Sequence, residues 1–535
     1  YRASKLKYHL YKQTLAEVFD FVKAYNKQHG RDVKCYVPTH SMINYASWGI
    51  VSPESSLLGV GADGFIAQVW TGTARTPNWY DGEEGQRTFE TAFLEYGAMQ
   101  NIVRASGKRV WYLNDPIEDN PRHSWYDYRT NWESTLVASL LQPEVWRYEV
   151  MPWPHRIFRG RYPSTQPGRG NAGRGAPRVP IPDAYETELA QVISAMGDMR
   201  QPADQVKWER AGTRGTGVLV SDTMMFERWG PDHSDADLSH FYGQALPLLM
   251  RGVPVEPVQI ETAALDRYRT LLLSYEGQKP PTAAFHDRLA AWVKAGGALV
   301  VIDDDRDPFN KVREWWNTGD LHYATPRHDL FARLGLPPDA EGKRTVGGGT
   351  VVYAKKSPSQ LSHTPSGADT VRDAVKTALA ATGQAWTESP ALVLRRGPYV
   401  IAAGLSSSGP AESPRLTGRF IPLFDASQPV VRVFTVGRGV HGLLVDLDRY
   451  PNDYAGVVAA ACRVRNEKVS ADSITFDADG QSDTNAVVSV VLPAAPKSVS
   501  VAGKRLDGES AAYRDGVLRL RFASSPTAIP IVIAR

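Results

Sequence analysis

Acidic side chains follow several predicted strands in the first 160 residues. Asp115, Glu118 and Asp119 follow the run RVWYL, Glu149 lies in the run VWRYEVM, and Glu54 lies in WGIVSPESS after an earlier strand. Glycoside hydrolysis needs two carboxyl groups that flank the scissile bond, one protonated and one ionised. Acids at the ends of adjacent parallel strands can meet that geometry. The alternative is structural, because Asp115 and Asp119 can also cap turns around the prolines that follow them.

Tryptophan is concentrated in the same part of the chain. Eight of the 14 tryptophans fall within the first 163 residues: Trp48, Trp70, Trp79, Trp111, Trp125, Trp132, Trp146 and Trp153. One interpretation is a large aromatic core. The other is a cleft with aromatic walls, whose faces suit the apolar C–H faces of sugars.

Other catalytic signatures are missing or misplaced in the sequence. The run GVGADG at 59–64 matches a dinucleotide-binding pattern, but its strand FIAQVW comes after it instead of before it. There is no H-E-x-x-H, no P-loop and no G-x-S-x-G elbow. The two cysteines, Cys35 and Cys462, provide neither a disulfide framework nor a cysteine-rich zinc site. We therefore expect no metal and no cofactor.

Composition limits the class of protein. The chain has 535 residues, of which 42% are hydrophobic and 22% charged, a globular profile for two to four domains. Sixty-one basic and 58 acidic residues give a net charge of +3, which does not indicate a nucleic-acid partner. No apolar run approaches 18 residues, so we expect a soluble protein without a membrane span. The compartment stays open between cytoplasm, periplasm and exterior.

The elements that would position the acids alternate between strand and helix. Strands are expected at 33–38, 65–70, 109–113 and 145–151, and helices at 10–25, 87–105, 131–141 and 183–199. This alternation predicts a parallel sheet with helices outside it. Four strands are half of a (β/α)8 barrel, whose strand carboxyl ends carry catalysis. We therefore predict the C-terminal half of such a barrel over residues 1–205.

Two further domains are expected. Residues 206–345 contain buried strands such as TGVLVSD, RTLLLSYE and ALVVIDDD alternating with helices, which predicts an α/β domain of the flavodoxin or class I amidotransferase type. Neither cysteine lies in it, so it has no glutaminase nucleophile. Residues 346–535 contain short Val-rich and Ile-rich runs between Gly, Pro and Ser turns, including VVYAKK, PYVIAAG and LRLRF. These predict an all-β domain, a sandwich preceded by a linker.

This order of domains resembles glycoside hydrolase family 42 and relatives such as family 164. The stretch LLLSYEGQKPPTAAFHDRLAAWVKAGGALVVIDDD is similar to the family 42 trimerisation domain. The resemblance implies a retaining enzyme with its acid/base on barrel strand four and its nucleophile on strand seven. With VKCYVP as strand five, the nucleophile falls in NDPIED, with Glu118 the first choice and Asp115 the second. Glu149 then has a supporting or sugar-binding role, and the acid/base falls upstream of Tyr1.

The same alignment of strands predicts substrate contacts at the barrel rim. His40, Asn44 and Tyr45 follow strand five, Trp70 and Arg75 follow strand six, and Trp153 follows strand eight. Amide and guanidinium groups can bind vicinal hydroxyls, and tryptophan faces can stack on sugar rings. Each of these residues could instead be packed in a core.

The sequence thus predicts a glycoside hydrolase that cleaves a β-linked glycan or glycoside by a retaining two-carboxylate mechanism. The middle domain predicts a homotrimer. Two alternatives stay open: a non-catalytic carbohydrate-binding or assembly protein on the same scaffold, and an inverting barrel glycosidase.

Overall fold

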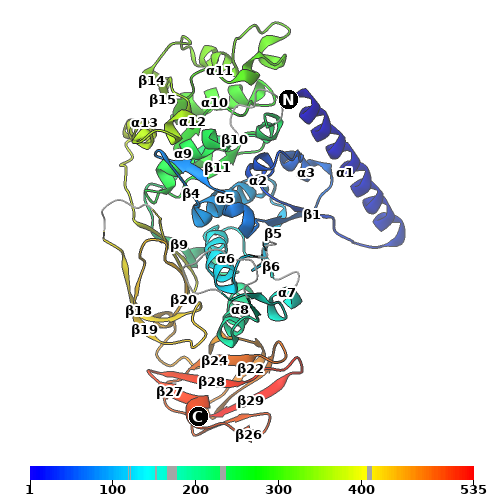
Figure 1. The fold of residues 1–535 in the computed structure, drawn as a ribbon, viewed down its shortest axis with the longest axis vertical. Coiled ribbons are helices and arrows are strands. Elements are labelled where there is room, and N and C mark those ends of the chain that lie inside the picture. The colour runs from blue at the N-terminus through cyan, green and yellow to red at the C-terminus, as the bar shows by residue number, and fades with distance from the viewer. Residues whose placement is uncertain (118–119, 121, 151–153, 165–176, 229–236, 407–411) are drawn as a thin grey trace. The chain divides into compact units, whose positions relative to one another are not determined.

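The computed structural model describes residues 1–117, 120, 122–150, 154–164, 177–228, 237–406 and 412–535. It is a mixed α/β structure with several β-sheets and a β-rich C-terminal part (Figure 1). The chain forms two compact units. Unit 1 comprises residues 1–113, 211–390 and 405–411, and unit 2 comprises residues 114–210, 391–404 and 412–535.

Unit 1 begins with a parallel sheet of order β1-β2-β5. Its strands are β1 (Tyr36–Thr39), β2 (Gly64–Gln68) and β5 (Arg109–Asn114). The helices around them are α1 (Arg2–His29), α2 (Met42–Ser47), α3 (Glu54–Leu57), α4 (Thr71–Ala74) and α5 (Thr88–Ser106), and β3 (Asn78–Tyr80) and β4 (Glu83–Gly85) form a hairpin. Because the three strands are parallel, their carboxyl ends lie at one edge of the sheet.

Local sequence explains how α1 packs and where α5 ends. On α1, Leu15, Phe19 and Val22 pack in a small core with Cys35 and Ala62. Helix α5 ends where Gly107 adopts a left-handed conformation with φ of 64°, and its N–H bonds the carbonyl of Val103. A residue without a Cβ takes this conformation at no steric cost, so the chain can turn there into β5.

The four strands predicted for the first region are present. They are β1, β2, β5 and β6 (Tyr148–Val150), so the predicted strand positions are confirmed. No sheet in the described part of the chain is a closed eight-stranded barrel. The half-barrel therefore stays a prediction.

A second sheet of unit 1 has the order β11-β10-β12-β13-β15-β14. Its strands are β10 (Thr216–Val220), β11 (Glu256–Gln259), β12 (Thr270–Leu273), β13 (Ala298–Ile302), β14 (Gly342–Val346) and β15 (Gly349–Ala354). All pairings are parallel except that of the edge strand β14. The helices are α9 (Ser239–Leu249), α10 (Ala284–Lys294), α11 (Pro326–Leu334), α12 (Pro358–Ser362) and α13 (Gly367–Ala381). This is the α/β arrangement that the sequence predicts from residue 216 onward.

Helix α5 connects the two sheets of unit 1, because it packs on β11. The side chain of Asn101 on α5 accepts a hydrogen bond from the Gln259 N–H at 2.9 Å and donates to the Tyr268 hydroxyl at 2.8 Å. Both bonds are buried, so they fix the position of α5 on the second sheet.

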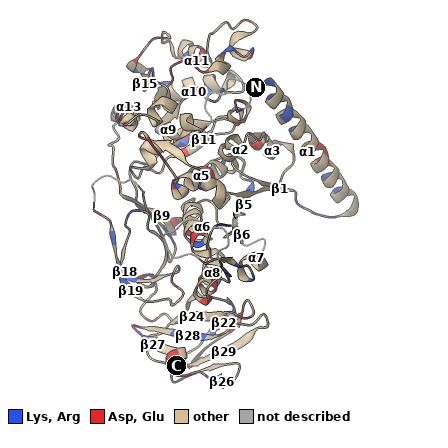
Figure 2. Ribbon diagram, in the orientation of Figure 1, with Lys and Arg blue, Asp and Glu red and all other residues tan. Residues whose placement is uncertain are grey.

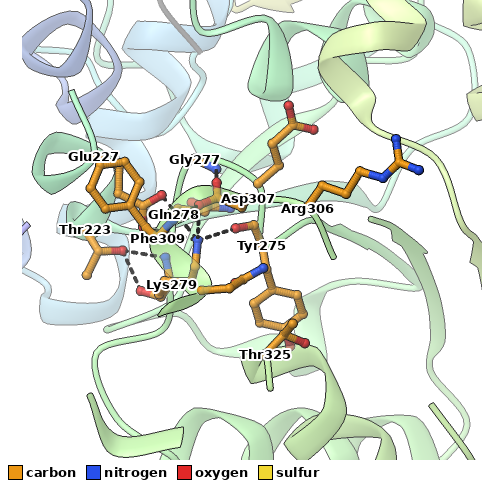
Figure 3. A network of polar contacts seen from close by, with 12 residues as sticks. Thr223, Glu227, Tyr275, Gly277, Gln278, Lys279, Arg306, Asp307, Phe309 and Thr325 are labelled. Atoms are coloured by element: carbon orange, nitrogen blue, oxygen red, sulfur yellow. Dashed lines mark hydrogen bonds and ion pairs between the residues drawn. The ribbon is translucent and has the colours of Figure 1, made fainter. Parts of the chain in front are cut away.

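A network of polar contacts around Lys279 lies beyond the carboxyl ends of β10, β12 and β13 (Figure 3). The chain adds β11 on one side of β10 and β12 on the other, so the strand order reverses between β10 and β12. In open α/β sheets ligands bind at such a point. Here the Lys279 ammonium lies 3.2 Å from both Glu227 and Asp307 and donates to the Tyr275 carbonyl at 2.6 Å. The three charged side chains are at most 1% exposed. This position thus holds a cluster of buried charged side chains, which we call the buried ion cluster.

Unit 2 contains helices α6 (Trp125–Leu140), α7 (Pro154–Phe158) and α8 (Asp183–Met196) and the short pair β7 (Tyr162–Pro163) and β8 (Arg178–Val179). Helix α6 packs on an antiparallel sheet of order β19-β18-β20-β17-β16-β9. The strands of that sheet are β9 (Val206–Arg210), β16 (Ala391–Arg396), β17 (Tyr399–Gly404), β18 (Arg415–Pro422), β19 (Val431–Thr435) and β20 (His441–Asp446).

The C-terminal part of unit 2 consists of two antiparallel sheets with a shared core. One contains β21 (Gly456–Ala460), β24 (Asn485–Val491), β28 (Val517–Ala523) and β27 (Ala511–Arg514). The other contains β22 (Arg463–Val469), β23 (Ser473–Asp479), β29 (Ile529–Ala534), β25 (Ser498–Val501) and β26 (Lys504–Arg505). Residues of both sheets, such as Phe476 and Leu520, belong to one hydrophobic cluster, as in a sandwich.

The structure differs from the sequence prediction just after residue 346. The run VVYAKK does not begin the all-β region, because it contains most of β15, which pairs in parallel with β13. Helix α13 follows it, and its Val371, Val375 and Leu379 are buried at helical spacing. A short Val-rich run does not reveal whether its partners are parallel or antiparallel. The domain boundaries at 205 and 345 stay a prediction.

Charges of both signs are interspersed along elements such as α1 (Figure 2). Among the helices that the structure describes, none is both long enough and apolar enough to cross a bilayer.

Candidate functional site

Four aromatic side chains gather at the carboxyl edge of the first sheet of unit 1. We call His40, Tyr45, Trp48 and Trp70 the aromatic rim. His40 directly follows β1, Tyr45 lies on α2, Trp48 follows α2, and Trp70 comes two residues after β2. Parallel pairing of β1 with β2 brings these segments to the same edge.

The rings of the rim contact one another in a chain. His40 lies 5.6 Å from Tyr45 and 5.7 Å from Trp48 between ring centres, and Trp48 lies 5.9 Å from Trp70, edge to face. Trp48 is 39% exposed, and His40, Tyr45 and Trp70 are half-buried. Aromatic pairs at these distances attract and so fix ring orientation. The result is a cluster of packed aromatic rings in which Trp48 is exposed to solvent.

The hydrogen bonds of His40 set its tautomer. Its Nδ1 lies 2.9 Å from the Gln68 carbonyl oxygen, which can only accept, so Nδ1 carries the proton. Burial lowers the pKa of His40 below its ordinary value, and the bond to Gln68 opposes that effect only in part. The ring is thus neutral at pH 7, with Nε2 as a hydrogen-bond acceptor.

Tyr45 is held from both sides. Its hydroxyl lies 3.2 Å from the Thr39 hydroxyl. It also accepts a hydrogen bond from the backbone N–H of His40 at 3.2 Å. Helix α2 begins next to these groups, because the Ser41 hydroxyl accepts from the Asn44 N–H at 3.1 Å and so caps the helix. The turn between β1 and α2 therefore places Tyr45 against His40.

A fully buried carboxyl lies beneath this turn. Glu54, at the start of α3, accepts hydrogen bonds on Oε1 from the hydroxyls of Thr39 and Ser52, both at 2.6 Å. Burial raises the pKa of Glu54 to about 8, against the two hydroxyl bonds that lower it. At neutral pH this side chain is therefore mainly a neutral carboxylic acid that ties α3 to β1.

A second buried carboxyl supports the start of α2. Glu95 on α5 accepts from the Ser41 hydroxyl at 3.2 Å, and burial raises its pKa to about 8. Hydrogen bonds from Ser41 and Asn44 offset part of that rise. Both Glu95 and Asn44 are at most 2% exposed. They can position the rim, but they do not reach solvent.

The predicted catalytic acids are only partly within the described structure. Glu118 lies outside the described residues, as does Asp119. Asp115 follows β5, is half-buried, and accepts the Ile117 N–H on Oδ1 at 3.1 Å. That bond is the turn-capping role that the sequence left open for this residue. Glu149 lies on β6 and is half-buried.

The predicted substrate contacts separate into two groups. His40, Tyr45 and Trp70 come together in the aromatic rim, with Trp48 between His40 and Trp70. Asn44 is buried below them, Arg75 is half-buried directly after α4, and Trp153 lies outside the described residues.

Three residues of the site were not predicted as site residues: Trp48, Glu54 as a support, and Glu95. The sequence feature that could have identified Trp48 was its place in the tryptophan-rich region. Glu54 was noted in the sequence only as one of several acids that follow a strand. Glu95 gave no signal, because it lies inside a helix pattern.

The described residues contain no group of three or more His, Cys, Asp or Glu side chains arranged to hold a metal ion. Both cysteines are buried, and burial raises the pKa of Cys462 to about 12. A thiol with that pKa stays protonated and is a poor nucleophile.

No family model matches the chain, and no curated protein matches it. Among solved structures, the chain is similar to a beta-galactosidase from Bacillus circulans sp. alkalophilus, with 11% identity over 78% of this chain and 64% of that one and a TM-score of 0.41. It is also similar to a rhamnosidase from Novosphingobium sp. PP1Y, with 13% identity over 98% of this chain and 51% of that one and a TM-score of 0.35. The chain thus spans less than two thirds of the length of either protein. Both are glycosidases by name, but similarity of this size leaves the function to be argued from the residues of this chain.

Proposed function

We propose that the chain belongs to a glycoside hydrolase that cleaves a β-linked glycan or glycoside by a retaining mechanism, as the resemblance to family 42 implies. The observation that carries the proposal is the aromatic rim. It combines a tryptophan that is 39% exposed with a neutral histidine acceptor at the carboxyl edge of a parallel sheet. Aromatic faces next to a few fixed polar groups suit a sugar ring.

In this proposal the sugar stacks on Trp48 and Trp70 and its hydroxyls bind His40 and Arg75. Glu118 attacks the anomeric carbon and forms a glycosyl ester while the leaving oxygen takes a proton from an acid. Water then hydrolyses the ester, which frees the sugar and restores the carboxylate. Asp115 is the second choice for the nucleophile, and Glu149 supports binding.

One observation favours the alternative of a non-catalytic carbohydrate-binding protein on the same scaffold. The two acids below the rim, Glu54 and Glu95, are at most 2% exposed, and Asp115 caps its own turn. A binding protein needs the rim but no accessible carboxyl pair. An assay of hydrolysis separates the two functions.

The experiment measures hydrolysis of a panel of 4-nitrophenyl α- and β-glycosides. We expect turnover of at least one β-glycoside, a loss of about 10⁴-fold or more in Glu118→Gln, a milder defect in Asp115→Asn, and mainly a higher KM in Glu149→Gln. Trp48→Ala should raise KM more than it lowers kcat, because stacking binds the ground state as well. Full activity in Glu118→Gln would contradict the assignment.

The anomeric form of the first product separates retention from inversion. Proton NMR of the product before mutarotation should show the β-anomer from a β-glycoside. An α-anomer would favour the inverting alternative, whose carboxyl groups lie about 6.5–9.5 Å apart instead of about 5–5.5 Å.

We further propose that the protein is a homotrimer that assembles through residues 206–345. The support is the buried ion cluster of Lys279, Glu227 and Asp307, which fills the position where related folds bind ligands. A domain that has a complete hydrophobic core but no reactive site can serve as an interface between subunits. Light scattering should give three times the chain mass of 59.0 kDa, and a monomer at micromolar concentration would contradict it.

A further inference from the structure

Unit 2 contains a pocket of about 460 Å³ between helices α6 and α8 and the loop after β18. Its aromatic and charged lining residues are Trp125, Arg129, Tyr185, Glu188, Phe424, Asp425 and Arg521. Its volume lies within the range of about 300–1,000 Å³ found for small-ligand sites. None of these residues belongs to the aromatic rim.

The pocket has an aromatic wall. Trp125 at the start of α6 lies 5.9 Å from Tyr185 on α8, with 34° between the ring planes. Trp125 is half-buried and Tyr185 is 2% exposed, so the indole is the ring with surface to offer. A partly exposed indole face favours stacking with the C–H face of a sugar.

Next to that wall, Arg129 is fixed before any ligand arrives. Its guanidinium lies 2.8 Å from Glu133 and 2.7 Å from Glu188, and it donates to the Phe424 carbonyl at 2.9 Å. A side chain held in this way loses little rotamer freedom when it binds a ligand. Burial raises the pKa of Glu188 to about 9, so of the two carboxyl groups on Arg129 it is Glu133 that balances the guanidinium. Arg521 and Asp425, which also line the pocket, have opposite charges, so the pocket offers little net charge to an ion. It suits a neutral ligand that both donates and accepts hydrogen bonds.

One polar group in the pocket wall lacks a partner. The hydroxyl of Tyr185 is buried and has no hydrogen bond to any residue that the structure describes. Burial and the neighbouring carboxyl groups of Glu188 and Glu133 raise the pKa of Tyr185 well above its ordinary value. The hydroxyl therefore stays protonated and can donate a hydrogen bond to an acceptor on a ligand.

We infer that this pocket binds one sugar unit of a neutral glycan, stacked on Trp125 with its hydroxyls bonded by Arg129, Glu188 and the Tyr185 hydroxyl. The choice of a glycan, among neutral polyhydroxylated ligands, rests on the proposed function. The site would hold a glycan at residues other than those of the aromatic rim.

The test is saturation-transfer NMR and tryptophan fluorescence with galactose, rhamnose, mannose and β-1,4-galactobiose, on the full chain and its variants. We expect at least one probe to bind, with affinity at least 10-fold lower in Trp125→Ala and a few-fold lower in Tyr185→Phe. Trp386→Ala is the matched control, a half-buried tryptophan of unit 1 whose loss should leave binding unchanged. Tyr185→Phe removes a single oxygen and so tests the site even if Trp125→Ala does not fold.

The outcomes separate this inference from the proposed function. If binding survives in Trp48→Ala but is lost in Trp125→Ala, the pocket is a sugar site, whether or not the protein hydrolyses any glycoside. If binding is lost only in Trp48→Ala, sugars bind at the aromatic rim alone and the inference is wrong while the proposed function stands. Binding of no probe, or unchanged binding in both Trp125→Ala and Tyr185→Phe, would also overturn the inference.

Discussion

Glu54, the buried acid beneath the aromatic rim, should make the free energy of unfolding depend on pH. Glu54 has a folded-state pKa of about 8 against an ordinary value of 4.5. A carboxyl with a raised pKa holds its proton more tightly in the folded state. Its stabilising effect is therefore fully present below pH 4.5 and is lost as the pH rises toward 8.

The size of the change in the free energy of unfolding follows from the difference between these two pKa values. Each pH unit between the two pKa values changes the free energy of unfolding by about 1.4 kcal/mol for one carboxyl. Between pH 5 and pH 8, Glu54 should therefore contribute a loss of about 3–4 kcal/mol. Glu95, whose pKa is also raised to about 8, adds a parallel loss.

Glu54→Gln removes this titration and keeps the acceptor for the Thr39 and Ser52 hydroxyls. We expect the variant to match the wild type at pH 5 and to exceed it at pH 8 by about 3–4 kcal/mol. Urea unfolding at pH 5, 6, 7 and 8 measures this. The control Glu84→Gln, an exposed acid on β4, should follow the wild-type curve. If the Glu54→Gln curve also runs parallel to the wild type, Glu54 does not titrate as a buried acid and the reasoning is refuted.

Two other predictions concern the ion cluster and metals. Lys279→Met leaves Glu227 and Asp307 buried without their ammonium and should destabilise the protein by about 3–5 kcal/mol in urea unfolding. The exposed control Lys343→Met should change stability by no more than about 0.5 kcal/mol, and equal effects of the two would contradict the cluster. Hydrolysis should survive treatment with EDTA, whereas activity lost to EDTA and restored by a divalent cation would mean that the acids bind a metal.

Strands buried on both faces were the most predictable part of the fold. Strands β10, β12 and β13 have the sequences TGVLV, TLLL and ALVVI, which are apolar apart from a leading threonine in the first two. They lie between turn or helix signals, so their type and limits follow from the sequence. The run TVVYA in β15 has the same composition, but its parallel pairing with β13 depends on a partner about 50 residues away. Local pattern contains no information on that partner, so β15 was assigned to the wrong region.

The same limit applies to the candidate site. His40 and Trp70 were predictable because each closely follows a strand, and parallel strands bring such residues to one edge. Trp48 follows a helix instead, so only the folded path of α2 brings it against His40. Glu95 lies within α5, and its burial depends on which face of that helix meets the Ser41 turn.

The most direct test of the central claim is to trap the glycosyl ester. In 2-deoxy-2-fluoro-β-glycosyl fluorides the fluorine at C2 slows hydrolysis of the ester more than its formation, so a retaining enzyme accumulates a covalent adduct. Incubation of the full chain with a panel of these compounds, followed by peptide mass spectrometry, should locate one added sugar on Glu118. An adduct on Asp115 would move the nucleophile within the same mechanism. A chain that hydrolyses a β-glycoside but forms no adduct with the matching compound would contradict the retaining mechanism itself.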